Sequence, residues 1–341
     1  MRYRIALIPG DGIGPELSDA TLTVLDAVQR QYAIDLEVVK VDGGDDCLRT
    51  RGAALPEDTI EAIKTSDACL KGPVGETAAD VIVRLRIMFD LYANIRPIKA
   101  YPNTPFMRPD IDLVIVRENT EGVYRGLELD LDAETAVCLR VISRRASQRI
   151  ARQAFELARR RGKMKEVTAV HKANVMKKTC GIFVRTCREV SREYPDVAFR
   201  DLYVDNAAMQ LIKRPHEFDV LVTTNMFGDI LSDEAAILVG GLGMAPGANI
   251  GDDFALFEPV HGSAPKYAGM NIANPTSMIL ASSFMLRWLG ENRTDTECLQ
   301  GADDIENALT AVFTKGVRTR DLGGTATTSE FAAAVARTIT G

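Results

Sequence analysis

The stretch PGDGIGPE, residues 9–16, joins a strand-like segment to a helical one and decides which α/β fold is open to the chain. Residues 5–8 form a short apolar run, and apolar residues after the stretch recur at helical spacing as far as Val28. Its glycines would let backbone N–H groups approach an anion at a helix N-terminus. The dinucleotide fingerprint G-x-G-x-x-G, however, requires glycine where Pro15 stands. The pattern argues against a Rossmann fold and leaves a simple strand-to-helix turn as the alternative.

The remaining chain alternates strand-length apolar runs with longer helical patterns. Alternation of this kind is typical of an α/β protein with much parallel sheet. Acidic and apolar residues alternate over residues 128–141, which predicts an antiparallel excursion on the surface. Further strands are predicted at residues 36–41, 68–70, 113–116, 167–170 and 220–223.

Composition excludes several classes of protein. A chain of 341 residues exceeds what one hydrophobic core usually fills, so one large domain or two joined domains are expected. The 41 basic and 47 acidic residues give a formal charge of −6, which offers no bulk attraction to nucleic acid or anionic membrane. Six dispersed cysteines and three dispersed histidines argue against a zinc site. No signal-peptide stretch or membrane-spanning run is visible, so a reduced, cytoplasmic protein is expected.

The acidic segment NMFGDILSDE, residues 225–234, is the first candidate for chemistry. If a helix begins near Gly228, Asp229 and Asp233 lie four residues apart on one face. Carboxylates so placed repel each other, and a divalent cation would reverse that penalty; oxygen-only ligands suit Mg²⁺ or Mn²⁺. A solvated acidic helix start, favoured by the helix dipole, explains the spacing equally well.

Basic side chains lie at the edges of other apolar segments. Arg86, Arg96 and Arg117 could each clamp a carboxylate, although ordinary surface ion pairs also explain any single one. Arg117 differs because it begins the polar run RENTEGVY at a predicted strand end, where α/β proteins bind ligands. Lys172, in HKAN after another strand, could act as a base or lie in water at a helix start.

Two later loops, residues 240–246 and 258–265, are rich in glycine, proline and small polar residues. Long loops of this kind are usually functional in compact domains. His261 could stack on a nucleobase, and a loop histidine without a role is the alternative.

In chain order these segments closely resemble the β-decarboxylating dehydrogenases, the family of isocitrate, 3-isopropylmalate, homoisocitrate and tartrate/malate enzymes. The resemblance covers essentially the entire chain. The matching stretches are GDGIGPE at 10–16, DLYANIRP at 90–97, RPDIDLVIVRENTEGVY at 108–124, HKAN at 171–174, VDNAAMQ at 204–210, TTNMFGDILSDEAA at 223–236, GGLGMAPGANIG at 240–251 and EPVHGSAPKYAGMNIANP at 258–275.

The resemblance implies a two-domain α/β fold with a mixed sheet that is not Rossmann. Residues 1–97 and 245–341 would form the cofactor-side large domain, and residues 98–244 the small domain. An arm near residues 123–165 would clasp a second subunit. The implied assembly is a homodimer that shares its active sites, with further pairing into a tetramer left open.

The same resemblance implies a metal site and two proton-transfer groups. Asp229 and Asp233 of one subunit, with Asp205 of the partner subunit, would hold Mg²⁺ or Mn²⁺. Lys172 of the partner subunit would help remove the hydroxyl proton of the substrate as hydride leaves. Tyr124 would protonate the enolate carbon after CO₂ is lost.

Substrate and cofactor residues are implied in the same way. Arg86, Arg96 and Arg117 would bind the carboxylates of a 2-hydroxy diacid. The residues implied at the cofactor are Asn174, His261, Gly262, Ser263, Ala264, Pro265, Lys266, Tyr267 and Asn274.

The segment before DLYANIRP sets the substrate in this family. Counting back from Arg86 places Asp80 and Ile82 where isocitrate enzymes carry a serine and an asparagine, and neither residue suits isocitrate. Ile82 and Val83 match the adjacent apolar residues of isopropylmalate enzymes. We therefore expect oxidation of 3-isopropylmalate to 2-oxoisocaproate and CO₂. 3-Methylmalate would fit the same pocket, and an NADP-preferring isocitrate or homoisocitrate activity is the alternative.

The choice of cofactor, NAD or NADP, stays open. Lys266-Tyr267 is the pair found in NADP-specific isocitrate enzymes, and Arg320 would add a third partner for a 2′-phosphate. Isopropylmalate enzymes, by contrast, are typically NAD-dependent. A non-catalytic regulatory subunit is a further alternative, but such subunits lose parts of the metal, lysine and tyrosine set that is complete here.

Overall fold

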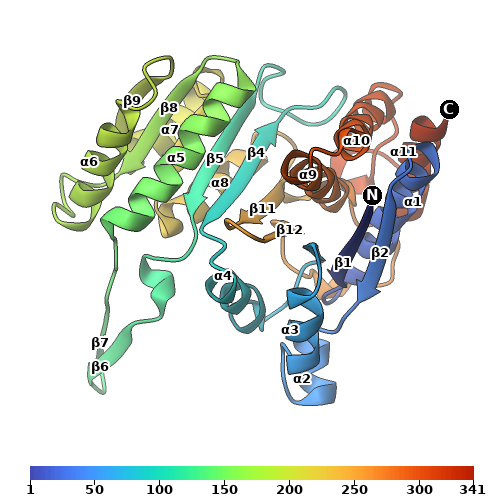
Figure 1. Ribbon diagram of the computed structural model, residues 1–341, viewed down its shortest axis with the longest axis horizontal. Helices are drawn as coiled ribbons and strands as arrows, with labels where there is room; N and C mark the ends of the chain where they lie inside the picture. The colour runs from blue at the N-terminus through green and yellow to red at the C-terminus, as the bar shows by residue number, and fades with distance from the viewer.

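One mixed sheet of ten strands runs through the molecule, which is described over residues 1–341 by a computed structural model (Figure 1). The strand order is β2-β1-β3-β12-β11-β4-β5-β10-β8-β9. Pairing is parallel towards both edges and antiparallel in the middle, between β12, β11, β4 and β5. The strands are β1 (Arg2–Ile8), β2 (Asp35–Lys40), β3 (Ala68–Lys71), β4 (Ala93–Lys99), β5 (Asp112–Glu118), β8 (Glu166–His171), β9 (Ala198–Tyr203), β10 (Val220–Thr223), β11 (Pro246–Ile250) and β12 (Ala255–Pro259).

Helices cover both faces of this sheet, which is why its inner strands read as continuous apolar runs. α5 and α6 pack on one face of β5, β10 and β8, and α7 and α8 pack on the other. The helices are α1 (Gly14–Gln31), α2 (Asp45–Arg51), α3 (Glu57–Lys64), α4 (Arg84–Met88), α5 (Arg144–Arg161), α6 (Thr179–Ser191), α7 (Val204–Lys213), α8 (Asn225–Ile237), α9 (Thr276–Arg293), α10 (Thr296–Thr314) and α11 (Thr328–Thr340). The predicted α/β class with a mixed, non-Rossmann sheet is confirmed.

Four apolar clusters make up the core. Two of them gather residues mainly from the two ends of the chain, one on each face of the sheet. The other two gather residues from the middle of the chain, between residues 92 and 245, again one on each face. The proposed domain boundaries of 1–97 with 245–341, and of 98–244, stay a prediction.

An exposed hairpin projects from the body of the molecule (Figure 1). It consists of β6 (Glu128–Asp132) and β7 (Thr135–Cys138), which pair antiparallel, so the surface excursion predicted for residues 128–141 is confirmed. Leu129 and Leu131 are exposed on it. Its role as a dimerisation arm stays a prediction.

Two local expectations were wrong by a few residues. α8 begins at Asn225, three residues before the expected start at Gly228, so both aspartates lie well inside the helix. Arg117 lies within β5 and does not follow it. No helix combines the length and the apolar character needed to cross a membrane.

Phe313 on α10 tests the packing of the largest cluster. Its buried ring lies 5.6 Å from that of Tyr101 and 5.4 Å from that of Phe331, measured between centroids. Phe313→Ala should lower the free energy of unfolding by about 3–5 kcal/mol, measured by urea denaturation. The exposed Leu48→Ala is the control and should change it by less than about 0.5 kcal/mol. Equal effects of the two changes would contradict the packing described.

Candidate active site

Three buried arginines form the floor of the candidate site. Arg96 lies on β4, Arg117 on the adjacent β5, and Arg86 on α4, and each exposes 6% or less of its surface. The alternative of ordinary surface ion pairs is therefore wrong for all three. Guanidinium groups stay charged when buried, so each needs a carboxylate or other acceptor nearby.

The helix α8 supplies carboxylates to two of these arginines. Asp229 is bonded to Arg117, and its Oδ1 lies 3.2 Å from Nη1 of Arg96. Asp233 lies one turn further along, with its Oδ1 3.4 Å from the same Arg96 nitrogen. Gly228 makes this approach possible, since a Cβ there would lie 2.6 Å from Cγ of Arg117. Two buried arginines hold Asp229, so the alternative of a freely solvated acidic helix start is wrong for it.

The electrostatics of these groups show an excess of positive charge. Burial, together with the charges of Arg96 and Arg86, lowers the pKa of Arg117 to about 9. Burial alone would raise the pKa of Asp229, but Arg117 and Arg96 outweigh it and hold that pKa below its usual value. Burial raises the pKa of Asp233 despite the opposing charge of Arg96. An added anion at this point would therefore be stabilised.

Tyr124 joins the same cluster from the loop after β5. Its Oη donates a hydrogen bond to Oδ2 of Asp229 at 2.5 Å, and the guanidinium of Arg117 lies 5.1 Å from the centre of its ring. Burial raises the pKa of the Tyr124 phenol, and the bond to Asp229 adds to the effect. The phenol therefore keeps its proton near neutral pH, as a proton donor must.

A buried cluster of polar side chains around Glu258 stabilises Arg86, and the sequence analysis did not identify it. Glu258 on β12 lies 3.0 Å from Nη2 of Arg86 and 2.9 Å from Nζ of Lys71. Asn249 on β11 donates to Glu258 at 2.8 Å and accepts from Nε of Arg86 at 3.0 Å. Burial alone would raise the pKa of Glu258, but Lys71 and Arg86 hold it at about 2.

A period-two pattern of polar residues within apolar strands could have identified this group. Asn94 and Arg96 alternate on β4, and Asn249 and Glu258 are the polar positions of β11 and β12. Side chains two apart on a strand share a face, so these residues must line one side of the sheet.

Lys172 and Asp205 form a separate pair. Lys172 follows β8, Asp205 lies in the first turn of α7, and their side chains meet at 2.7 Å. Within one chain no three His, Cys, Asp or Glu side chains gather as a metal-binding group. Asp205 therefore does not join Asp229 and Asp233 in the single chain.

The glycine-rich loops enclose a cavity of about 670 Å³. His261, Gly262, Ala264, Tyr267 and Asn274 line it, together with Arg320 and Asp321. Of the other residues expected at the cofactor, Ser263, Pro265 and Lys266 belong to the same loop without lining the cavity, and Asn174 is exposed next to Ala173.

His261 is held as a neutral ring beside this cavity. Its Nδ1 donates to the Gly262 carbonyl at 3.0 Å, and Ser277 donates to Nε2 at 3.1 Å. This assignment follows because a carbonyl oxygen can only accept. Burial lowers the pKa of His261, which favours the same neutral state.

The PGDGIGPE turn packs against the loop that carries His261. The Ile13 amide donates to the Ser263 carbonyl at 2.9 Å, and a Cβ on Gly12, whose φ is +58°, would lie 2.1 Å from that oxygen. Asp11 accepts backbone N–H groups of Asp45, Asp46 and Gly75. Its carboxylate joins this turn to the segment that leads into Asp80.

The expected substrate segment contains a π-helical turn, Ala79–Val83. Asp80 is exposed, Val83 is half-buried, and Ile82 exposes 7% and packs in the core cluster with Leu85. π turns inside helices often occur at functional sites, which agrees with the position expected from the sequence.

A family model described as "Isocitrate/isopropylmalate dehydrogenase" matches residues 4–335. The chain belongs to this family. Its members are metal- and NAD(P)-dependent decarboxylating dehydrogenases that act on small hydroxy acids, and this chain is an enzyme of the 3-isopropylmalate dehydrogenase-like type.

Several relatives that align with nearly the whole chain have related names. The chain is 54% identical to the 3-isopropylmalate dehydrogenase of Methanothermobacter thermautotrophicus, covering 98% of both chains. It is 51% identical to the 3-isopropylmalate/3-methylmalate dehydrogenase of Methanocaldococcus jannaschii, covering 99% of both. It is 48% identical to the isocitrate/homoisocitrate dehydrogenase of Thermus thermophilus, covering 98% of both. The crystal structure of isocitrate dehydrogenase from Methylococcus capsulatus superposes with a TM-score of 0.93, at 42% identity, over 99% of this chain and 100% of that one.

Glu258→Gln should destabilise the protein because Lys71 and Arg86 would lose their shared counter-charge. Removing one partner of a buried ion pair costs about 3–5 kcal/mol, measurable by urea denaturation. Because the folded pKa lies below the ordinary value of 4.5, the stabilisation by Glu258 is complete above that value and is lost as the pH falls towards 2. The difference between wild type and variant should therefore be constant near neutral pH and shrink in acid. A difference that grows in acid would contradict the described network.

Proposed function

We propose that this chain oxidises and decarboxylates 3-isopropylmalate to 2-oxoisocaproate and CO₂, with reduction of NAD or NADP, as a step of leucine biosynthesis. The observation that carries the proposal is the convergence of three buried arginines beside the protonated phenol of Tyr124. Together with Lys71 they place four positive charges against the three carboxylates of Glu258, Asp229 and Asp233. A 2-hydroxy diacid supplies the two carboxylates that such a floor favours. The names of the relatives at 54% and 51% identity support the choice of substrate.

The residues present fit a hard divalent cation. Asp229 and Asp233 offer carboxylate oxygens one helical turn apart, and no sulfur or imidazole ligand stands beside them. Asp205 of the partner subunit would add a third carboxylate. When bound, Mg²⁺ or Mn²⁺ would supply the positive charge that polarises the 2-hydroxyl and later the carbonyl oxygen.

The protein's own groups would handle the protons at two atoms of the substrate. Lys172 of the partner subunit, as a neutral amine, would accept the 2-hydroxyl proton, and the bound dinucleotide would supply the acceptor for the C2 hydrogen as hydride. The bond between C3 and its carboxylate then breaks, CO₂ departs, and the electron pair forms the enolate. Tyr124 donates its proton to C3, which completes the 2-oxo acid. Arg86, Arg96 and Arg117 hold the carboxylates in place throughout.

The substrate's third substituent would meet the segment of the π turn. Val83 is half-buried and offers aliphatic surface at this turn, whereas Ile82 exposes only 7% and packs against the core. No positive side chain at these two positions offers a γ-carboxylate a partner. Burying an alkyl group there contributes about 1–3 kcal/mol. A 3-methylmalate activity uses the same contacts, whereas isocitrate would meet the carboxylate of Asp80.

The dinucleotide would occupy the cavity beside His261. Lys266 lies exposed at its edge, with Nζ 4.6 Å from the centre of the Tyr267 ring, and Arg320 lines the wall. These two cations favour the 2′-phosphate of NADP. Asp321, which lines the same wall, favours the free ribose hydroxyls of NAD. The proposal therefore includes both NAD and NADP as candidate cofactors.

A substrate panel tests the proposed reaction. 3-Isopropylmalate, 3-methylmalate, isocitrate, homoisocitrate, malate and tartrate are supplied to the purified enzyme with Mg²⁺ and with NAD or NADP separately. The highest kcat/KM is expected for 3-isopropylmalate, and excess EDTA should abolish turnover. A higher value for isocitrate, or full turnover in EDTA, would contradict the substrate or the metal, respectively.

Mixing two inactive variants tests the sharing of active sites between subunits. Lys172→Met and Asp229→Asn should each lose turnover by a factor of about a hundred or more. If Lys172 serves the partner's site, each mixed dimer contains one site with neither change. Unfolding and refolding the two together should then restore about a quarter of wild-type activity. Lys64→Met is the control for the loss of an exposed lysine and should remain active; a mixture that stays inactive would exclude the shared site.

A further inference from the structure

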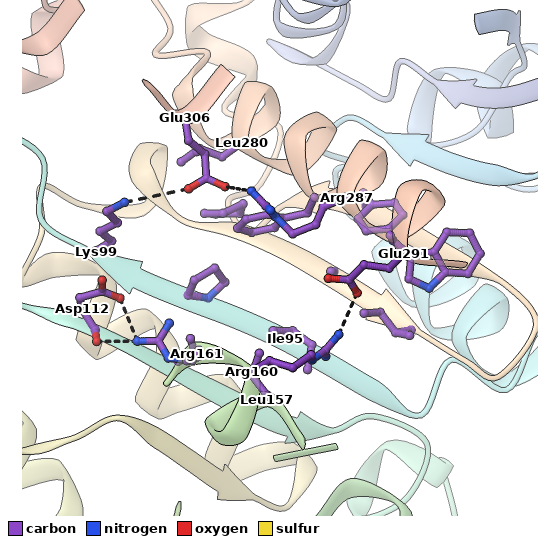
Figure 2. Close-up of a pocket in the computed structure, with 18 of the residues that line it drawn as sticks. Ile95, Lys99, Asp112, Leu157, Arg160, Arg161, Leu280, Arg287, Glu291 and Glu306 are labelled. Atoms are coloured by element: carbon purple, nitrogen blue, oxygen red, sulfur yellow. Dashed lines mark hydrogen bonds and ion pairs between the residues drawn. The ribbon is translucent and has the colours of Figure 1, made fainter. Parts of the chain in front are cut away.

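A second cavity, of about 440 Å³, is drawn in Figure 2. It lies on the opposite face of the sheet from the three arginines. Its volume falls within the range of small-molecule sites, which are concave and mostly apolar with a few polar groups. Neither the dehydrogenase chemistry nor the dinucleotide uses any residue of this cavity.

The alternation of side chains along the strands places the two sites back to back. On β4, Arg96 faces the active site while Ile95 and Pro97 line the cavity. On β12, Glu258 faces the active site while Phe257 lines the cavity. Only the thickness of one sheet therefore separates the cavity from the arginines.

Two helices from different parts of the chain form the walls. α5 contributes Leu157 and α9 contributes Phe284 and Trp288, all of which line the cavity. Across the mouth, Arg160 of α5 pairs with Glu291 of α9 at 2.7 Å, as Figure 2 shows. This pair links the two walls directly.

Of the rim cations labelled in Figure 2, Lys99 has the longest contact to a carboxylate. Lys99 lies 4.0 Å from Glu306, and that carboxylate is bound more closely by Arg287 at 2.9 Å (Figure 2). The neighbouring Asp112 already serves both Arg161 and Lys163. Lys99 is therefore the rim cation that remains available to an anionic ligand.

The positive charge of Lys99 affects the neighbouring Lys163. Burial lowers the pKa of Lys163, and the positive charge of Lys99 lowers it further. An anion placed beside Lys99 would relieve this repulsion.

We infer that this cavity binds a small organic anion, with its apolar body against Phe284, Trp288 and Leu157 and its acidic group on Lys99. A ligand of this kind combines the burial of apolar surface with one charge-assisted contact at the rim. Because the ligand lies between α5 and α9 and behind the strand that carries Arg96, its binding is coupled to the arrangement of the active site. Such coupling is reciprocal, so an active-site ligand must change the affinity of the cavity by the same factor.

Trp288 is the only tryptophan of the chain, so its fluorescence reports occupation directly. The probe is anilinonaphthalene sulfonate, an aromatic anion. Titration into the native enzyme should quench Trp288 saturably, with one probe bound per chain. Lys99→Glu should weaken this binding by about tenfold or more, since repulsion replaces attraction at short range. Lys40→Glu, an exposed lysine on β2, is the matched control and should leave binding unchanged.

Phe284→Ala provides a second variant that keeps every charge and should also weaken binding. Thermal melting establishes that each variant is folded before it is titrated. No saturable quenching in the wild type, or equal binding by wild type and both folded cavity variants, would overturn the site. If NAD or NADP displaces the probe equally from the wild type and from Lys99→Glu, the probe is bound in the dinucleotide cavity. That result would also overturn the inference.

The coupling is tested by repeating the titration with saturating 3-isopropylmalate and Mg²⁺, and this part rests on the proposed function. A change of about threefold or more in the dissociation constant of the probe is expected. Calorimetry first establishes whether 3-isopropylmalate binds. If it does not bind, the proposed substrate is wrong, and this result is distinguished from a failure of the coupling. If it binds and the dissociation constant is unchanged, the coupling is refuted.

Discussion

Burial of several positive charges on one face of the central sheet is the constraint on which the rest of this structure depends. Arg86, Arg96 and Arg117 cannot lose their charge, and leaving them unpaired away from water would cost several kcal/mol each. Glu258 compensates both Arg86 and Lys71, Asp229 is shared by Arg96 and Arg117, and Asp233 lies near Arg96 as well. These carboxylates stabilise the buried arginines enough for the protein to fold. The positive charge that remains attracts a ligand with carboxylates.

The mixed topology of the sheet makes this arrangement possible. The inner parallel strand β10 is buried on both faces, while β4, β11 and β12 carry Asn94, Arg96, Asn249 and Glu258 on one face and apolar side chains on the other. The polar face becomes the active site and the apolar face becomes the cavity beneath α5 and α9. One set of three strands therefore connects two chemically opposite sites, and a shift of these strands would be felt on both faces.

Strand and helix patterns predicted the α/β class, and the resemblance to the decarboxylating dehydrogenases implied that Arg117, Asp229 and Tyr124 belong to one site, where the structure brings them together. They did not identify the pairing of Glu258: the alternation of polar residues places it on one face of the sheet, but its partner Arg86 is 172 residues away and only the fold brings the two together. The start of α8 was misplaced by three residues although Thr224, a favourable N-cap residue type, stands directly before it; its side chain makes no capping hydrogen bond. The separation of Lys172 and Asp205 from the other site residues within one chain also needed the structure, because no local pattern reports distances between segments so far apart in the sequence.

The central claim is that a divalent cation is held by Asp229 and Asp233 of one chain and Asp205 of another. Electron paramagnetic resonance of Mn²⁺, titrated against the enzyme with saturating 3-isopropylmalate, measures this directly. The account predicts one bound Mn²⁺ per chain, and at least about tenfold weaker binding in Asp205→Asn, while the surface change Asp110→Asn has no effect. Wild-type affinity for Mn²⁺ in a folded, dimeric Asp205→Asn enzyme would contradict it.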